Sequence, residues 1–453
     1  MELENKNILV LGLSISGISV AKFAAKKGAN VIITEKRSQK AEDTPLIKEL
    51  GELKIKVEMG FHSDEAVKNA DIIVTSPSIP PEAEIFQMAK CYNKEVISEP
   101  DFAFLNKSEN SKFITITGTN GKTTTTKLVS EILTNAGFKA PFCGNIGIPP
   151  TDLLDENADF FVMEISSYQI FHSKYLKPYI GSFINYTPDH ITWHGNEEEY
   201  LRVKKSHFIG NNAPEFAVLN FKDKNVRALE KETNSKIVAF EEEFFDFCIF
   251  EKSNKLFCEH NKDMEKVCDL STAKIFGKHN YQNMMCAVGI AKILNISNDV
   301  IQKTIDDFTP PAHRIEFIAQ IDGIKYYNDS KATNCDSSIC ALKAFKEPVV
   351  LIAGGRDKMT DLTEFVQTIE QKASSVVLIG EATDRFEQAM LEIGYKKIIK
   401  TNTLEKAIDI AGSLKQGDVL FSPACASFDM FKNFEERGEV FRNHVLSKTA
   451  QVK

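Results

Sequence analysis

The chain has 453 residues, of which 43% are hydrophobic and 26% are charged, and its net charge is −8 with a pI near 5.7. This length exceeds one hydrophobic core and predicts about three domains of ~150 residues each. The acidic balance argues against a protein that binds nucleic acid or anionic membranes in general.

Membrane insertion and secretion are not expected either. The longest apolar stretch, residues 8–25, is broken by three serines, Gly17 and Lys22, and it follows an acidic start. It therefore fits neither a membrane span nor a signal peptide. The nine scattered cysteines include no C-x-x-C pair, which is typical of a reducing compartment and predicts a cytoplasmic protein.

The first hundred residues alternate between predicted strands and helices. "NILVLGL" and "NVIITEK" resemble buried parallel strands on either side of a helix over residues 17–28 that ends at Gly28, and "ADIIVTSPSIP" predicts another strand. "VLGLSISGIS" followed by Glu35 is similar to a dinucleotide fingerprint, but Ser14 occupies the middle glycine position. A side chain there obstructs a pyrophosphate, so a nicotinamide cofactor is not expected, whereas a nucleotide-sugar diphosphate remains compatible with the fold.

Two further α/β series follow. The second begins at Phe113 and continues through apolar strands over residues 158–167, 180–190 and 216–223, with peripheral β structure expected over 241–269. The double proline of "DDFTPPAHRIEFI" predicts a boundary, after which the third series begins. The prediction is an α/β protein of three domains: a Rossmann-like domain over 1–106, a central P-loop ATPase-like domain with a mostly parallel sheet over 107–311, and a C-terminal Rossmann-like domain over 312–453.

"FITITGTNGKTTTTKLVSEIL" runs from a strand through a glycine turn into a helix. Glycines allow backbone N–H groups to converge on an anion, and a helix N-terminus adds partial positive charge. Lys122 would reach the β- and γ-phosphates, and the Thr123 hydroxyl would bind Mg²⁺. Ile116 stands where the full Walker pattern has its first glycine, so the motif is a shortened G-x-x-G-K-T. A tight turn with a surface lysine is the alternative, and nucleotide triphosphate binding is favoured.

Other candidate groups stand where predicted strands end. Glu164 closes an apolar strand and is a candidate metal ligand or water-positioning group, with a helix cap or surface acid as the alternative. His190 and His194 have a zinc-like spacing, but Pro188 and Gly195 indicate a loop and no third ligand is evident. His190 is favoured as an Mg²⁺ or substrate ligand and His194 as a structural residue. Two adjacent lysines, Lys204 and Lys205, fall on a predicted helix, and by themselves they would be expected to face solvent.

Nine motifs occur in the order found in Mur ligases, and the chain resembles that family over nearly its whole length. They are "GTNGKTTT", "GNIG", "EISSYQ", "TPDHITWHG" with the following lysine, "GKHNYQN", "PAHRIE", "NDSKATN", "GGRDK" and "SPACASFDMFKNFEERG". The last two resemble the D-glutamate-adding members. The resemblance implies an ATP-dependent ligase of peptidoglycan synthesis that phosphorylates the carboxylate of UDP-N-acetylmuramoyl-L-alanine to an acyl phosphate, which the D-glutamate amine then attacks.

The same resemblance implies roles for individual residues. Gly118, Thr119, Asn120, Gly121, Lys122 and Thr124 would hold ATP phosphates, with Asn280 and Asn283 at the adenine and Arg314 and Asp329 at the ribose or phosphates. Thr123 and Glu164 would bind one Mg²⁺, and His190 a second, together with a carbamylated lysine, placed first at Lys204 and alternatively at Lys205. Lys122, Glu164, His190, Lys204 and Arg314 would be the catalytic residues.

The substrate contacts implied by the resemblance come from all three predicted domains. Ser14, Ile15, Ser16, Glu35, Lys36 and Arg37 would surround the uridine diphosphate, and Asn145, Ser166 and Gln169 would line the muramoyl-alanine site. Thr333, Lys358 and Ser427 would bind the D-glutamate carboxylates, with Phe428 and Phe434 nearby. Two departures stand out: Ser78 replaces a glycine near the uracil site, and Phe428 replaces an aliphatic residue. The expected protein is a monomer that binds neither nucleic acid nor membrane.

Two alternatives remain open from the sequence. One is a related ATP-dependent amide ligase with another acceptor, such as folylpolyglutamate synthase, although the uridine-site motifs and "SPACAS" disfavour it. The other is a nucleotide-binding regulatory or scaffold protein that has lost catalysis, although Lys122, Thr123, Glu164 and His190 are all present.

Overall fold

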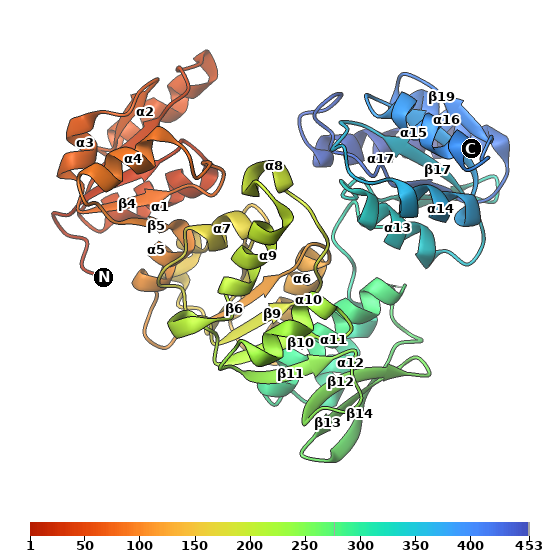
Figure 1. The fold of residues 1–453 in the computed structure, drawn as a ribbon, viewed down its shortest axis with the longest axis horizontal. Helices are drawn as coiled ribbons and strands as arrows, with labels where there is room; N and C mark the ends of the chain where they lie inside the picture. The colour runs from red at the N-terminus through yellow and green to blue at the C-terminus, as the bar shows by residue number, and fades with distance from the viewer. Residues whose placement is uncertain (276, 452–453) are drawn as a thin grey trace. The chain divides into compact units, whose positions relative to one another are not determined.

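A computed structural model describes residues 1–275 and 277–451 (Figure 1). Three β-sheets, each covered by helices, confirm the predicted three-domain α/β fold. The chain forms two compact units, the first over residues 1–273 and 282–307 and the second over 274–281 and 308–453. The first unit holds two of the sheets, and the second unit holds the third. No helix in the described part of the chain combines the length and apolar character of a membrane span.

The first sheet has five parallel strands in the order β3-β2-β1-β4-β5. Its strands are β1 (Asn7–Leu11), β2 (Asn30–Glu35), β3 (Lys56–Met59), β4 (Ile72–Thr75) and β5 (Val96–Ser98), and its helices are α1 (Ile15–Lys26), α2 (Thr44–Glu52), α3 (Asp64–Asn69), α4 (Glu84–Cys91) and α5 (Glu99–Asn106), with a 3₁₀ turn η1 (Ala41–Asp43). Along β1, Ile8 and Val10 enter one buried cluster while Leu9 and Leu11 enter another. This alternation explains the continuous apolar run, because both faces of the sheet are covered.

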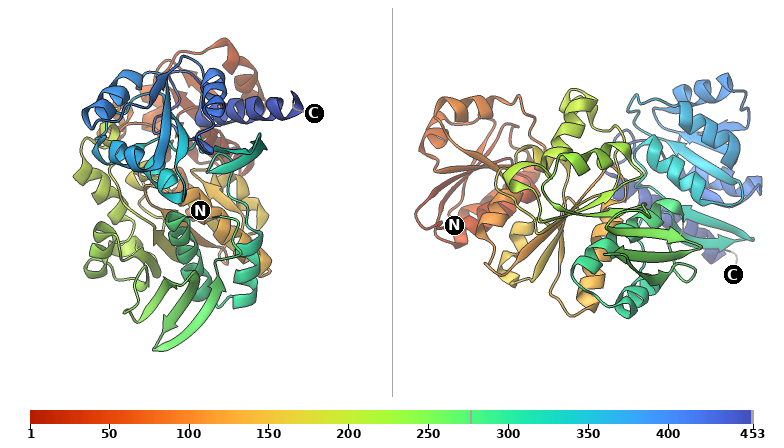
Figure 2. Two further views of the ribbon diagram at one scale, coloured as in Figure 1. Left: turned by 90° about the vertical axis from the view of Figure 1, so that its right-hand side faces the viewer. Right: turned by 60° about the horizontal axis from the view of Figure 1, so that its bottom comes forward.

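The second sheet has nine strands in the order β14-β13-β12-β11-β10-β9-β6-β8-β7, and only β12–β14 pair antiparallel. The strands are β6 (Lys112–Thr117), β7 (Phe142–Gly144), β8 (Phe160–Glu164), β9 (Ile180–Phe183), β10 (Phe216–Asn220), β11 (Lys236–Phe240), β12 (Phe247–Lys252), β13 (Lys255–His260) and β14 (Asp263–Asp269). The predicted peripheral β structure over 241–269 is confirmed, and Figure 2 shows these green strands at one end of the sheet.

Helices and 3₁₀ turns accompany the second sheet. They are α6 (Lys122–Asn135), η2 (Pro150–Glu156), α7 (Ser167–Phe171), α8 (Ile191–His194), α9 (Glu197–Ser206), η3 (Gly210–Asn212), α10 (Lys224–Arg227), η4 (Ala228–Lys231), α11 (Lys278–Ile293) and α12 (Asn298–Asp307). The prediction of a loop around residues 190–194 is wrong in part. Residues 191–194 form one helical turn, which begins after His190 in the left-handed conformation at φ 56°.

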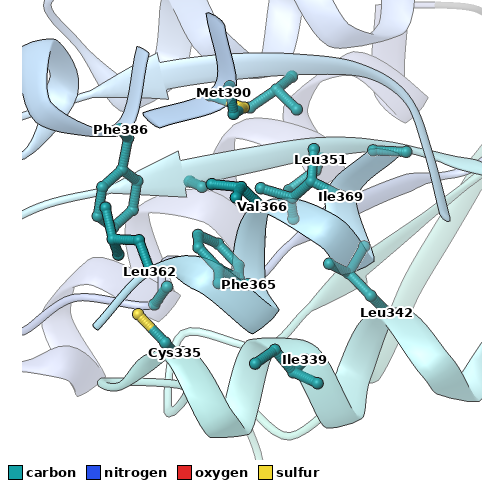
Figure 3. Packing of buried hydrophobic residues seen from close by; sticks show 14 of the residues in the cluster. Cys335, Ile339, Leu342, Leu351, Leu362, Phe365, Val366, Ile369, Phe386 and Met390 are labelled. Carbon is teal, nitrogen blue, oxygen red and sulfur yellow. The ribbon is translucent and has the colours of Figure 1, made fainter. Parts of the chain in front are cut away.

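The third sheet has six strands in the order β15-β16-β20-β17-β18-β19, and only β15 runs antiparallel to its neighbour. Its strands are β15 (Glu316–Ile321), β16 (Ile324–Asn328), β17 (Val349–Gly354), β18 (Ala373–Ile379), β19 (Ile398–Lys400) and β20 (Val419–Phe421), and its helices are α13 (Cys335–Ala344), α14 (Thr363–Lys372), α15 (Thr383–Glu392), α16 (Leu404–Leu414) and α17 (Phe434–Gln451). Separate apolar clusters cover its two faces, and Figure 3 shows Ile369 of α14 beside Leu351 of β17 in the larger one.

Candidate active site

The turn between β6 and α6 has the backbone of an anion-binding loop. Gly121, at the N-cap of α6, has a φ of 83° and provides no side-chain cap for the helix. The Lys122 Nζ folds back over the turn and donates hydrogen bonds to Gly118 O at 3.0 Å and Thr119 O at 2.8 Å. The cation and the helix N-terminus therefore lie at one place, where both favour a negatively charged ligand.

Gly121 is required because another side chain packs against it. A Cβ atom at this position would lie 2.2 Å from Asn283 Oδ1 on α11. Asn283, a predicted adenine contact, is itself 3% exposed. The structure thus brings this residue against the phosphate loop.

Residues that sequence reasoning missed hold the loop from the segment that follows the neighbouring strand β9. Asn185 accepts a hydrogen bond from Asn120 N at 2.9 Å and donates one to Asn120 O at 3.1 Å. Thr119 donates from its hydroxyl to Thr187 O at 2.8 Å, while Thr187 N donates back to that hydroxyl at 3.0 Å. These contacts tie the phosphate loop to the segment that follows β9. The available signal was the polar run that follows β9 in "INYTPDH".

Glu164 lies at the carboxyl end of β8 and faces the start of α6. Its carboxylate accepts a hydrogen bond from the Thr123 hydroxyl at 2.7 Å and one from Asn145 Nδ2 at 2.8 Å, and the residue is 3% exposed. Thr124, the next predicted phosphate contact, is also buried. A hydroxyl and a carboxylate held this close are oxygen ligands of the kind that Mg²⁺ prefers.

Lys204 is buried, contrary to the expectation that both adjacent lysines face solvent. Its Nζ donates to Gly118 O at 2.9 Å and approaches Thr117 Oγ1 at 3.4 Å, and the residue is 1% exposed. Burial, with the nearby charge of Lys122, lowers the pKa of the Lys204 ammonium well below its ordinary value. Lys205 differs, since its Nζ lies 2.6 Å from a Glu232 carboxylate oxygen.

His190 and His194 lie in different environments. The His190 Nδ1 is 2.7 Å from the Tyr168 hydroxyl, its Nε2 is 3.6 Å from Asp189 Oδ2, and its side chain is 40% exposed. His194 is 7% exposed, with Nε2 at 2.9 Å from the Ser167 hydroxyl. Burial lowers the pKa of His194 to about 4. Within the described residues no group of three or more His, Cys, Asp or Glu side chains could hold a metal ion.

The predicted uridine-diphosphate residues lie at the carboxyl edge of the first sheet. The Ser14 hydroxyl caps α1 by accepting from Gly17 N and is 2.7 Å from the Ser76 hydroxyl. Glu35 accepts a hydrogen bond from Leu13 N at 3.0 Å. The structure thereby brings the two predicted segments, 14–16 and 35–37, to the same strand ends.

Side chains of these segments also have partners of their own. Arg37 forms two hydrogen bonds of 2.6 and 2.7 Å with the Asp43 carboxylate, and this contact lowers the pKa of Asp43 to about 2. Lys36 lies 3.6 Å from Glu84, Ser16 is half-buried, and Ile15 is 64% exposed.

Ser166 and Gln169 begin α7 with a reciprocal cap. The Ser166 hydroxyl and backbone N–H both donate to Gln169 Oε1 at 3.0 Å, and Gln169 N donates to that hydroxyl at 3.3 Å. Both residues are buried, whereas Asn145, the third predicted muramoyl-alanine contact, is exposed. The cap fixes the direction of α7 directly beyond Glu164.

In the second unit, Asp329 follows β16 and is buried. It accepts hydrogen bonds from the Ser422 hydroxyl at 2.7 Å and from Ile315 N at 3.2 Å, and burial raises its pKa to about 7. Arg314 is half-buried and close enough to lower the pKa of Asp329 in part. The pKa of His279 is lowered to about 4, mainly by burial and in part by the positive charge of Arg314. Asn280, the other predicted adenine contact, is half-buried on α11.

The predicted D-glutamate residues lie on the loops that follow β16, β17 and β20, at the carboxyl edge of the third sheet, except Phe434, which begins α17. Thr333 and Lys358 are half-buried, and Ser427 is 2% exposed. The Lys331 Nζ lies 3.6 Å from the centre of the Phe434 ring. Phe428 is 71% exposed.

Family models and full-length relatives match the chain. The models are "Mur ligase MurD-like, N-terminal domain" over residues 6–98, "Mur ligase middle domain" over 116–291 and "Mur ligase, glutamate ligase domain" over 313–425. A UDP-N-acetylmuramoylalanine–D-glutamate ligase from Caldanaerobacter subterraneus is 38% identical over 98% of this chain and 99% of its own length. The chain belongs to the Mur ligase family. A ligase of the same description from Thermoanaerobacter pseudethanolicus is also 38% identical, over 98% of this chain and 99% of its own.

Solved structures agree with this fold. The UDP-N-acetylmuramate–alanine ligase of Thermotoga maritima superimposes with a TM-score of 0.62, covering 98% of this chain and 99% of its own, at 17% sequence identity. The loops that carry the predicted residues of this Mur ligase thus follow strands of a fold that its family shares.

Proposed function

We propose that this Mur ligase joins D-glutamate to the L-alanine carboxylate of UDP-N-acetylmuramoyl-L-alanine and cleaves ATP to ADP and phosphate in doing so. The observation that carries the proposal is the 38% identity, over 98% of the chain, to a ligase described by that reaction. The lysine-covered phosphate loop beside Glu164 and Lys204 supports the ATP-dependent part.

The proposed chemistry has two steps. An oxygen of the L-alanine carboxylate attacks the γ-phosphorus of ATP, the bond to the β,γ-bridging oxygen breaks, and an acyl phosphate and ADP form. The D-glutamate amine then attacks the acyl carbon, loses a proton, and phosphate leaves to form the amide. Phosphoryl transfer of this kind depends on positioning and on charge neutralisation. Lys122 and the turn 118–121 supply both at the transferring group, and Arg314 would add a fixed guanidinium charge.

Residues near the phosphate loop fit Mg²⁺. The Thr123 hydroxyl and the Glu164 carboxylate are 2.7 Å apart, and both offer oxygen atoms of the kind that Mg²⁺ prefers. They would hold one ion, while His190 and the modified Lys204 would hold a second. Bound Mg²⁺ supplies neutralisation of phosphate charge.

Carbamylation is proposed at Lys204, with Lys205 disfavoured. Addition of CO₂ requires an uncharged amine, and the lowered pKa of buried Lys204 favours that form. Lys205 instead points to Glu232, with its Nζ 2.6 Å from that carboxylate, and is not buried beside the phosphate loop.

The remaining residue roles are proposals drawn from family resemblance and position. Residues 14–16 and 35–37 would bind the uridine diphosphate, and Asn145, Ser166 and Gln169 the muramoyl-alanine part. The adenosine would contact Asn280, Asn283 and Asp329. Thr333, Lys358, Ser427, Phe428 and Phe434 would form the D-glutamate site. We also propose that the protein acts as a cytoplasmic monomer, with domain boundaries after residues 106 and 311.

ATP hydrolysis measured with UDP-N-acetylmuramoyl-L-alanine and a panel of amino acids tests the function. Phosphate release that depends on D-glutamate, and on neither L-glutamate nor a diamino acid, is expected. Turnover with a folate substrate and L-glutamate instead would favour the folylpolyglutamate synthase alternative. Absence of turnover with every acceptor would refute the enzymatic proposal.

A further inference from the structure

Arg437, in the first turn of α17, is a buried cation without a carboxylate partner. The residue is 1% exposed, and burial lowers its pKa to about 10. Within residues 1–275 and 277–451 no carboxylate lies within ion-pair distance of its guanidinium. Such burial is unfavourable unless hydrogen bonds replace water.

The guanidinium donates four hydrogen bonds to two different loops. Its Nε donates to the Ser330 hydroxyl at 3.0 Å and its Nη2 to Ser330 O at 2.7 Å. Its Nη1 donates to Cys425 O at 3.1 Å and Ala426 O at 3.2 Å. A planar group with donors in a fixed fork can thus hold the two loops at one separation.

Both loops lead directly into predicted site residues. Ser330 stands between Asp329 and Thr333 in the turn after β16, and Cys425–Ala426 precede Ser427 after β20. The strands β16 and β20 are neighbours in the sheet. Arg437 therefore joins the chain segments that carry the nucleotide-side and amino-acid-side residues of the second unit.

The loop after β20 is held in an unfavourable conformation. Ala424 has a φ of 60°, in the left-handed region that favours glycine. Pro423 O accepts a hydrogen bond from Gly354 N at 2.8 Å, and Ala426 O accepts one from Arg356 N at 2.9 Å. These bonds and those of Arg437 oppose relaxation of the loop.

Close packing leaves the loop little alternative. A Cβ atom on Gly355 would lie 2.5 Å from Ala426 O and 3.1 Å from Arg437 Nη1. Because Gly355 has no side chain, the backbone after β17 can pack against both the loop after β20 and the Arg437 guanidinium. Loss of the guanidinium would therefore release Ala426, and with it Ser427, from its position.

We propose that Arg437 is a positioning residue of the amino-acid site, which holds the loops of Thr333 and Ser427 at the separation that binds the incoming amino acid. The inference rests on the proposed function, because it takes the role of those two residues from it. Arg437 itself contacts loop backbone and Ser330, and the effect on the reaction passes through Thr333 and Ser427.

Arg437→Lys tests the proposal, since it keeps the charge but a single amine cannot serve both loops. We expect the KM for D-glutamate to rise at least tenfold while the KM for UDP-N-acetylmuramoyl-L-alanine changes less than twofold. Arg442→Lys is the matched control: Arg442 lies on the same helix and contacts Glu316 on β15 at 2.5 Å, away from both loops. It should lower thermal stability with both KM values unchanged.

A purely structural role for Arg437 predicts a different result. Fewer active molecules would lower kcat and leave both KM values unchanged, and that outcome would overturn the proposal. If Arg437→Lys does not fold, Ser330→Ala decides, because it removes one acceptor: a two- to fivefold rise in the D-glutamate KM supports the proposal, and an unchanged KM overturns it. A wild-type enzyme that uses another amino acid would refute the proposed function alone, and the same KM comparison would then use that amino acid.

Discussion

Glu99, the first residue of α5, should destabilise the protein increasingly as the pH rises. It is 1% exposed, and its Oε1 accepts hydrogen bonds from Thr151 N at 3.1 Å and from the Thr151 hydroxyl at 2.5 Å. Its Oε2 is buried without a hydrogen-bond partner among the described residues. Burial raises the pKa of this carboxyl from 4.5 to about 7 despite the bonds from Thr151.

The size and sign of the effect follow from these pKa values. Because the folded pKa is raised, the folded state binds more protons than the unfolded state between pH 4.5 and 7. The contribution of the neutral carboxyl is complete below the unfolded pKa and is lost as the pH rises through the folded pKa. At about 1.4 kcal/mol per pKa unit, the loss approaches roughly 3 kcal/mol above pH 7, of which about 2.5 kcal/mol falls between pH 5 and 8.

Glu99→Gln removes this loss, since glutamine stays neutral and keeps an oxygen for Thr151. Urea unfolding followed by the fluorescence of Trp193, the single tryptophan and a residue of the same unit, measures the free energy of unfolding. The free energy of unfolding of Glu99→Gln, relative to that of the wild type, should increase by about 2.5 kcal/mol between pH 5 and pH 8. The exposed Glu52→Gln is the control. A Glu99→Gln difference that does not change with pH would refute a buried, protonated Glu99.

Three predictions concern the phosphate loop. Lys122→Ala should lower kcat by about 10³ or more in a phosphate-release assay, because it removes a cation from the transferring phosphoryl group, and wild-type turnover would contradict the assignment of the loop. Lys204→Ala should abolish turnover and recover part of it with added short-chain carboxylic acids, whereas Lys205→Ala should retain turnover; the reverse pattern would make Lys205 the modified residue. Gly121→Ala should raise the KM for ATP, because its Cβ would meet Asn283 Oδ1 at 2.2 Å and its φ is 83°; an unchanged KM would contradict a requirement for glycine.

The sheets were predictable because their signals are local. Apolar runs such as "NILVL" and "VVLIAG" are buried on both faces, and polar residues follow where the strands end. The helical turn Ile191–His194 could not be predicted. It is a single turn without apolar periodicity, and it starts from His190, whose backbone is in the left-handed conformation.

Site residues that belong to a sequence motif could be predicted, whereas those whose position depends on tertiary packing were harder to predict. Lys204 and Lys205 look alike as neighbours, but α9 turns only one of them inward. The signal was present, since Lys204 follows Tyr200 and Val203 at helical spacing and both are buried. Asn185 had only the weak signal of a polar run after an apolar strand, and Arg437 had none, because most of its partners are backbone atoms of distant loops.

Transfer of oxygen from substrate to phosphate tests the central claim most directly. UDP-N-acetylmuramoyl-L-alanine labelled with ¹⁸O in its L-alanine carboxylate is turned over with ATP and D-glutamate, and the released phosphate is analysed by mass. Phosphorylation of that carboxylate predicts one ¹⁸O atom in each phosphate, because the acyl–oxygen bond breaks when the amine attacks. Unlabelled phosphate from a turnover that forms the amide would contradict it.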